Sequence, residues 1–191
     1  MQRRLVLVLA FLAVAAGCLS KSKEETIPVL IADLISDEQM RSGSAGAQLV
    51  KIGEPAVPAL AELLRTGDAR VRKIAAATLW GMGIKGRAAV PELTACLDDP
   101  DYEIRAGSAM ALQAMGPAAA PAVPALVRAL KDHEGIVRQR AVMALGAIGP
   151  AASEALPALD EATRLDAVRP AAEEAMARIR GIPWPPPSPS P

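Results

Sequence analysis

The sequence predicts an all-α protein, built as a solenoid of about five stacked two-helix units. Three observations support this prediction: sequence markers recur at a fixed step, alanine, leucine and valine supply most of the apolar residues, and most prolines stand where a helix can begin. Apolar residues make up 51% of the 191 residues, but aromatic residues only 2%. Alanine and leucine favour helices because their side chains lose little freedom there, and small side chains allow helices to pack closely.

Three markers recur in phase along the chain. A Val-Pro-x-Leu or Leu-Pro-x-Leu motif begins at Val57, Val90, Val123 and Leu156. An arginine after valine or isoleucine stands at Arg72, Arg105, Arg138 and Arg169. A glycine closes a Leu-x-x-Met or Leu-x-x-Ile motif at Gly83, Gly116 and Gly149. All steps are 33 residues except the last arginine step, which is 31; self-similarity at such a period is typical of stacked repeats.

A shorter and degraded unit precedes these four. Pro28-Val29-Leu30, Arg41 and Ile52-Gly53 stand about 30 residues before their counterparts. We therefore expect five units that together span 27–182, with the bounds 27–56, 57–89, 90–122, 123–155 and 156–182.

Each unit is expected to contain two helices, as 57–89 illustrates. Pro58 suits the first turn of a helix, where its missing N–H costs nothing. Gly67 and Asp68 end that helix, and Asp68 can cap the next one. In the second helix an apolar stripe is formed by Val71, Ala75, Leu79 and Met82. Neither helix can bury its apolar side alone, so neighbouring units must stack.

The early proline, the aspartate after the first helix and the Val-Arg or Ile-Arg pair resemble the HEAT repeat, particularly its short, Ala-rich bacterial form, which is also seen in phycobilisome lyase-like proteins. The resemblance covers 27–182 and implies a right-handed α-solenoid. Asp99 with Arg105, and Asp132 with Arg138, match the family at a spacing of six. In the family such pairs form a ladder of hydrogen bonds between adjacent units.

The ladder is one of two interpretations of these arginines. Thr66 replaces the aspartate in the unit 57–89, so that unit departs from the pattern. The alternative interpretation is a basic binding stripe formed by Arg72, Arg105, Arg138 and Arg169. We favour the ladder.

The N-terminus has the pattern of an export signal. Arg3 and Arg4 precede an apolar run from Leu5 to Ala16, which is too short to span a bilayer comfortably. The sequence that ends in Cys18 resembles the lipobox of bacterial lipoproteins. The resemblance implies cleavage after 1–17, acylation of Cys18, a tether over 18–26 and attachment to a lipid bilayer. An ordinary cleaved signal with an incidental cysteine is the alternative.

The same resemblance bears on the location of the mature protein. An aspartate after the lipidated cysteine often retains Gram-negative lipoproteins in the inner membrane, whereas this chain has Leu19. We therefore expect a protein that is exported and anchored in the bacterial cell envelope. In a Gram-negative cell the periplasmic side of the outer membrane is favoured.

Charge and residue types argue against nucleic acid, metal and catalysis. The chain has 21 basic and 21 acidic residues, and removal of Arg3 and Arg4 with the leader leaves 19 against 21, a net charge of −2. Such a chain has no general attraction to nucleic acid. His133 is the single histidine, whereas a metal site or an acid–base pair needs clustered groups. We expect no cofactor and no enzymatic activity, and we expect Cys96 to be a buried thiol.

The family places its second helices on the concave face, where a partner would bind. Eight residues after the arginine of each unit stand Trp80, Gln113, Gly146 and Ala177. The candidate partner-binding residues are Lys73, Ala77, Trp80, Met110, Gln113, Gln139, Arg140 and Met143. Tryptophan, methionine and arginine are enriched in protein interfaces. Alternatively, Trp80 fills a gap beside the first unit, and the methionines belong to the core.

These expectations combine into two hypotheses. The first is a membrane-anchored lipoprotein scaffold that binds a protein or peptide through the concave face. The second is a self-associating structural envelope protein without a discrete groove. The Pro-rich tail over 183–191 should be extended, with Trp184 either capping the last unit or serving as a ligand for another protein.

Overall fold

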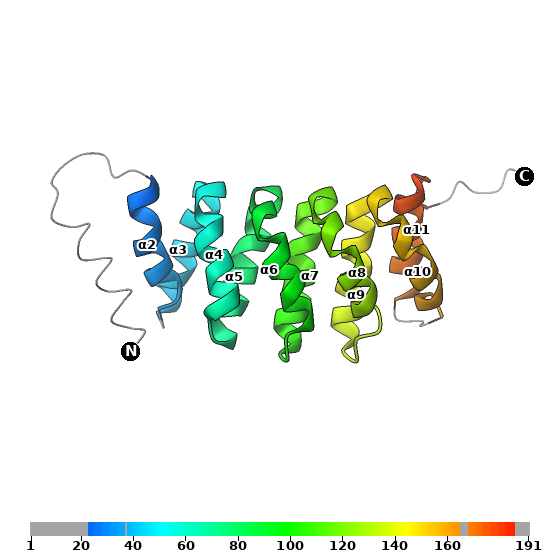
Figure 1. Ribbon diagram of the computed structural model, residues 1–191, viewed down its shortest axis with the longest axis horizontal. Coiled ribbons are helices and arrows are strands. Elements are labelled where there is room, and N and C mark those ends of the chain that lie inside the picture. Colours follow the sequence, from blue (N-terminus) through cyan, green and yellow to red (C-terminus); the bar gives the residue numbers. More distant parts are fainter. Residues whose placement is uncertain (1–22, 37, 165–167, 186–191) are drawn as a thin grey trace, which may run out of the picture.

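The computed structural model describes residues 23–36, 38–164 and 168–185, and it confirms the predicted all-α solenoid. Five consecutive helix pairs stand side by side along one long axis (Figure 1). The described residues contain helices, turns and loops but no strand. The predicted signal peptide, Cys18 and the end of the Pro-rich tail lie outside the described residues.

Each pair consists of a first and a second helix. The first helices are α2 (Lys23–Leu34), α4 (Val57–Thr66), α6 (Val90–Ala95), α8 (Val123–Ala129) and α10 (Leu156–Ala162). The second helices are α3 (Gln39–Ile52), α5 (Ala69–Met82), α7 (Tyr102–Met115), α9 (Gly135–Ile148) and α11 (Arg169–Arg180). Short 3-10 helices complete the units: η1 (Glu54–Ala56), η2 (Gly83–Ala89), η3 (Cys96–Asp98), η4 (Gly116–Ala122) and η5 (Gly149–Ala155).

Helix ends lie where the sequence predicts them. Each of α4, α6, α8 and α10 has proline in its first two positions. The carboxylate of Asp68 accepts a hydrogen bond of 2.9 Å from the backbone N–H of Val71 and so caps α5. Helix α5 ends at Gly83, whose φ is +54°, a conformation that glycine adopts at little cost.

Two features differ from the sequence-based expectation. Helix α2 begins at Lys23, inside the predicted tether, and Pro28 lies within the helix and not at its start. Lysine and glutamate are good helix formers, so a polar composition does not oppose a helix here. The second difference is the set of seven-residue 3-10 helices η2, η4 and η5. Their Gly-, Pro- and Ala-rich sequences carry no clear helical periodicity.

One apolar core runs through all five units. Its largest fully buried side chains include Leu34, Leu49, Leu60, Leu79, Leu93, Leu112, Leu126, Leu145 and Leu159. Cys96 is also buried, as predicted, and burial raises the pKa of its thiol. Since every unit contributes to the same core, the stack can be stable although no single unit could be.

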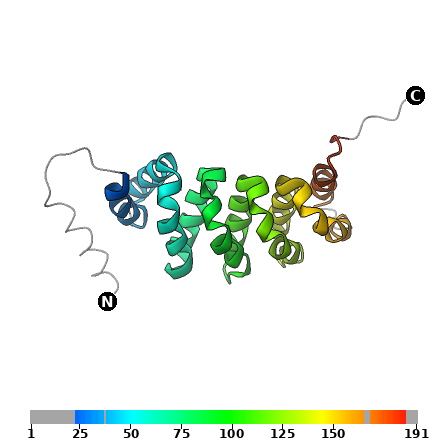
Figure 2. The ribbon, with the colours of Figure 1, turned by 45° about the horizontal axis from the view of Figure 1, so that its top comes forward.

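The two rows of helices pack differently. Helices α5, α7, α9 and α11 pack extensively on one another, whereas the first helices meet largely through the interposed η2, η4 and η5. The two rows are visible in Figure 2. The second helices therefore form a continuous row of direct helix–helix contacts. We call the solvent-exposed side of α5, α7, α9 and α11 the second-helix face.

Two helical stretches are long and apolar enough to cross a membrane by length and composition alone. Tyr102–Ala129 and Gly135–Ala162 each have 28 residues and mean hydropathies of 1.3 and 1.4. Each consists of a second helix, a 3-10 helix and the following first helix. Both contribute buried residues to the core, and core helices pass the same test, so the finding is weak evidence for a membrane span.

Candidate functional site

All eight candidate partner-binding residues lie on three neighbouring second helices. Helix α5 contains Lys73, Ala77 and Trp80, α7 contains Met110 and Gln113, and α9 contains Gln139, Arg140 and Met143. Trp80 is 49% exposed. Ala77 and Gln139 are also exposed, and the other five are half-buried. The exposure of Trp80 argues against its filling a core gap beside the first unit.

Exposure falls along one column of the second-helix face, the column of Trp80, from the second unit to the fifth. At the column of Trp80, Gln113 is half-buried, and Gly146 and Ala177 are buried. Beside Gly146 is a hollow of about 130 Å³, lined by residues of α7, α9 and α11 that include Gln113 and Met143. The Oε1 atom of Gln113 is buried and has no hydrogen-bond partner in the described residues. The second-helix face therefore combines the exposed indole ring of Trp80 with a small hollow beside Oε1 of Gln113, a hydrogen-bond acceptor without a partner among the described residues.

Lys73 belongs to an ion-pair network between two helices. Its Nζ atom lies 2.8 Å from Oδ2 of Asp101 and also contacts the carboxylate of Glu103. Hydrogen bonds to these two carboxylates raise the pKa of Lys73. The hydrogen bond from Lys73 also lowers the pKa of Asp101. The positive charge of Lys73 is therefore neutralised within the molecule.

The arginines that recur at the same place in successive units have a structural role. Nε of Arg72 donates to Oδ2 of Asp99 at 2.8 Å, and Nη1 donates to the carbonyl of Gly67 in its own unit. Arg105 repeats this arrangement with Oδ2 of Asp132 at 2.7 Å. Each guanidinium thus joins its own turn to the next unit, which confirms the ladder for Arg72 and Arg105.

The partners in the ladder differ from the pairs that the spacing of six suggests. Within a unit, Arg105 contacts Asp99 through the aspartate carbonyl oxygen, at 2.8 Å from Nη1. The carboxylate of Asp99 instead pairs with Arg72 of the preceding unit. A guanidinium has donors on two edges, so one arginine can serve its own turn and a neighbouring carboxylate together.

The described contacts include no equivalent arginine–aspartate pair, or rung of the ladder, between the first and second units. Oγ1 of Thr66 donates to the carbonyl of Glu62 in its own helix. Arg41 pairs with Glu38 on the surface. The counterpart of Arg72 is Ser42, because Gly53 precedes Gly83 by 30 residues; Oγ of Ser42 donates to the carbonyl of Leu34 at 2.6 Å. The 30-residue step thus places Ser42, the neighbour of Arg41, at the position that corresponds to Arg72.

The remaining predicted positions give no sign of a reactive site. The side chain of His133 is 78% exposed, with Nδ1 3.6 Å from Oδ1 of Asp132. The described residues contain no group of three or more side chains that could hold a metal ion. Trp184 is 40% exposed at the end of the described tail. The arrangement provides surfaces for binding, and the described residues contain no assembled catalytic group.

The repeated helix pairs, the shared core and the arginine ladder define a helical-repeat solenoid. The family model for HEAT repeats matches residues 57–123 and 90–177, which together are more than half of the chain. The protein belongs to the HEAT-repeat family. A comparison with curated proteins found no match.

Solved structures show the same fold. The complex of CpcE and CpcF of phycocyanin lyase from Nostoc sp. PCC7120 contains a chain with a TM-score of 0.67 and 23% identity, over 79% of this protein and 98% of that chain. A designed armadillo repeat protein in complex with the peptide (KR)4 has a TM-score of 0.62 and 17% identity, over 93% and 92%. An engineered protein gives 0.58 and 22%, over 94% and 90%. At these identities the likeness establishes the fold alone.

Proposed function

We propose that the protein is a membrane-anchored lipoprotein scaffold that binds a protein or peptide through its second-helix face. One observation carries the proposal: Trp80 is 49% exposed at a column where the other units have Gln113, Gly146 and Ala177. Packing does not require a large ring there, because those units form without one. Exposed tryptophans that become buried in a complex often dominate its binding free energy.

The surroundings of Trp80 suit a polypeptide ligand. Ala77 is exposed one turn before it, and Met110 and Met143 lie half-buried on the next two helices. The hollow beside Gly146 can accept a small side chain, and Oε1 of Gln113 can accept a hydrogen bond from a partner. Two of the similar structures contain a solenoid bound to a protein or a peptide, which supports this use of the fold.

Attachment to a membrane is the second part of the proposal. The lipobox-like sequence before Cys18 supports acylation of that cysteine, and Leu19 favours the periplasmic side of the outer membrane in a Gram-negative cell. Acyl chains contribute about 0.8 kcal/mol for each buried methylene, so two or more anchor a protein firmly. Mass spectrometry of the mature N-terminus should find a lipid-modified Cys18. An unmodified cysteine, or cleavage elsewhere, would contradict this part.

Partner binding can be tested with a matched pair of tryptophan variants. The protein is crosslinked in its native membrane, purified and examined for bound proteins by mass spectrometry. Trp80→Ala should remove a single dominant partner while the melting temperature stays unchanged. Trp184→Ala, which removes a ring of similar exposure from the tail, should leave that partner bound.

Other outcomes would redirect the proposal. If the wild-type protein captures only copies of itself, the self-associating structural hypothesis replaces the scaffold. If Trp80→Ala lowers stability by about 3–5 kcal/mol, as expected for an aromatic side chain in a core, Trp80 is a packing residue and the binding surface must be withdrawn.

A further inference from the structure

Arg138 repeats the position of the ladder arginines but lacks their carboxylate. Its Nη1 atom donates to the carbonyls of Asp132 and His133, at 2.7 and 2.9 Å, and so holds its own turn as Arg105 does. In Arg105 the other edge, formed by Nε and Nη2, is filled by the carboxylate of Asp132. In Arg138, Nε is buried and has no hydrogen-bond partner among the described residues.

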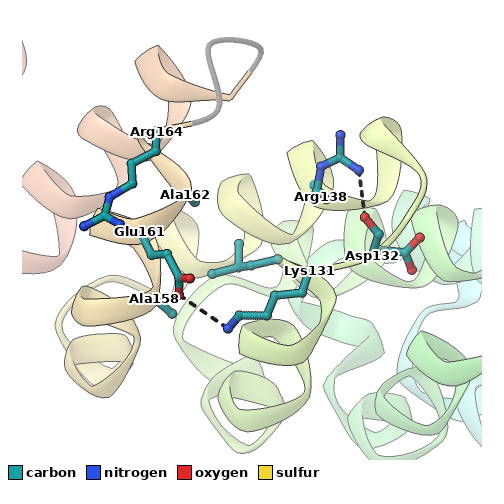
Figure 3. Close-up of a pocket in the computed structure, with 8 residues that line it drawn as sticks. Lys131, Asp132, Arg138, Ala158, Glu161, Ala162 and Arg164 are labelled. Atoms are coloured by element: carbon teal, nitrogen blue, oxygen red, sulfur yellow. Dashed lines mark hydrogen bonds and ion pairs between the residues drawn. The ribbon is translucent and has the colours of Figure 1, made fainter.

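A hollow of about 530 Å³ lies at the joint between the fourth and fifth units, between α10 and the turn that follows α8. Arg138 and Asp132 line one side of it, and Glu161 of α10 and Arg164 of the turn after α10 line the other (Figure 3). The volume falls in the range of about 300–1,000 Å³ that is usual for small-molecule pockets. A similar hollow at the joint of α4 and α6 contains Arg72 together with its partner Asp99.

The charges around the hollow leave two arginines without an acidic partner. Asp132 is paired with Arg105, and Glu161 lies 3.4 Å from Nζ of Lys131. Neither Arg138 nor Arg164 forms an ion pair in the part of the chain that the structure describes. The hollow therefore has a net positive charge that an anionic ligand would neutralise.

We propose that this hollow is a carboxylate-binding site, in which Arg138 takes the carboxylate of a ligand as Arg105 takes Asp132. The ligand is a small free carboxylate or an acidic side chain of a peptide. Arg164 supplies a second positive charge at the rim. Except for Arg138 of α9, the lining residues belong to α10 or to the turns that follow α8 and α10. None of them is a candidate partner-binding residue, so the site is distinct from the proposed partner-binding surface.

The preference for a carboxylate follows from the two filled rungs. The Nε–Nη2 edge of a guanidinium matches the two oxygens of a carboxylate, and such charge-assisted pairs are stronger than neutral hydrogen bonds. A buried N–H without a partner is unfavourable, so a ligand that reaches Nε relieves this cost. Lysine lacks this planar pair of donors and should not replace Arg138.

The test is a titration of the purified full chain, followed by NMR of the arginine Nε–H groups. The two probes are succinate and the blocked tetrapeptide Ala-Asp-Asp-Ala, and the tetrapeptide Ala-Asn-Asn-Ala is the uncharged control. The Nε–H resonance of Arg138 should shift with a carboxylate probe, while those of Arg72 and Arg105, already paired, should not. Added salt should weaken the binding.

Three variants make the result specific. Arg138→Lys should weaken binding about tenfold or more, the loss expected for a hydrogen bond between charged groups. Ala158→Glu places a carboxylate on the lining of the hollow without touching Arg138, and it should compete with the probe even if Arg138→Lys folds poorly. Asp166→Asn removes an acidic side chain two residues after Arg164 in the sequence, in the segment 165–167 that lies outside the described residues.

Each outcome decides the proposal. Binding of both probes supports a site for free carboxylates, and binding of the acidic tetrapeptide alone supports recognition of an acidic side chain. The proposal is overturned if neither probe binds, or if binding survives unchanged in both Arg138→Lys and Ala158→Glu. It is also overturned if probes bind only to Asp166→Asn, because Asp166 then fills the site in the native chain.

Discussion

The joint between the third and fourth units and the joint between the first and second are built from different interactions. At the former, Arg105 and Asp132 form a pair whose side chains are only 7% and 9% exposed. At the latter, Arg70 donates to the carbonyls of Ile35 and Ser36, at 3.0 and 2.5 Å, from an exposed position. An ion pair between Arg87 and Glu54 also joins the first two units, but both side chains are exposed. The described polar contacts of the first joint are thus exposed, whereas the central joint has a buried ion pair.

The difference indicates that the ladder ties the central units together and leaves the first unit more loosely attached. A buried pair makes each unit depend on its neighbour, since loss of one member leaves an uncompensated charge. Exposed hydrogen bonds carry no such penalty, because water can replace either partner. The first unit should therefore be the first part of the solenoid to unfold.

The largest effect is expected from Arg105→Ala. The substitution leaves the carboxylate of Asp132 buried without its partner, so the free energy of unfolding should fall by about 3–5 kcal/mol. Urea denaturation measures this change. Arg138→Ala is the matched control: it removes contacts with carbonyls but strands no carboxylate, and it should cost only about 1–2 kcal/mol. Equal losses in the two variants would contradict the role of the buried pair.

Acid should weaken the central joint through Asp132. Burial alone would raise the pKa of Asp132, but hydrogen bonds from Arg105 and from the backbone N–H of Glu134 outweigh it, so the pKa is lowered. The stabilisation is present above the unfolded-state pKa of about 3.9 and is lost as pH falls through the lower folded-state value. Below about pH 4, stability should decline more steeply in the wild type than in Asp132→Asn. Parallel curves would refute this.

A smaller and local effect is expected from Arg70→Ala. Loss of its bonds to the turn of the first unit should cost about 1 kcal/mol, because each is an exposed hydrogen bond. Hydrogen exchange should become faster in α2 and α3 and stay unchanged in α7 and α9. If exchange accelerates throughout the chain, the first unit is not a separately opening segment.

The smallest effect should come from building a rung into the first joint. The double variant Ser42→Arg with Thr66→Asp places an arginine and an aspartate at the positions that correspond to Arg72 and Asp99. A double-mutant cycle should give a favourable coupling of about 0.2–1 kcal/mol, as for a partly exposed pair. A coupling of zero would show that the degraded unit holds these positions in a different geometry.

The sequence was sufficient to predict the architecture because residues that start and end helices recur at the same places in successive units. The prolines predicted the starts of four first helices, and Asp68 and Gly83 predicted the start and end of α5. The structure confirms each of these. Periodicity could not predict η2, η4 and η5, since their glycine, proline and alanine residues favour no single face.

The sites were less predictable because they depend on partners far apart in the sequence. Arg105 pairs with Asp132, which is 27 residues away. The sequence instead drew attention to Asp99, which stands only six residues before Arg105. A signal for the carboxylate site was nevertheless present: six residues before the arginines of the last three units stand Asp99, Asp132 and Thr163, so the last unit offers Arg138 a threonine in place of an aspartate. The exposure of Trp80 required the structure, since an alanine, a glycine or a tryptophan fits its column.

Photo-crosslinking from the second-helix face in native membranes tests the central claim most directly. A photoreactive amino acid replaces Trp80 on α5 in one variant and Glu62, an exposed residue of α4 in the same unit, in the other. We expect one envelope protein to be joined covalently to position 80 and not to position 62. The same products from both positions, or only copies of this chain, would contradict a scaffold that binds its partner through the second-helix face.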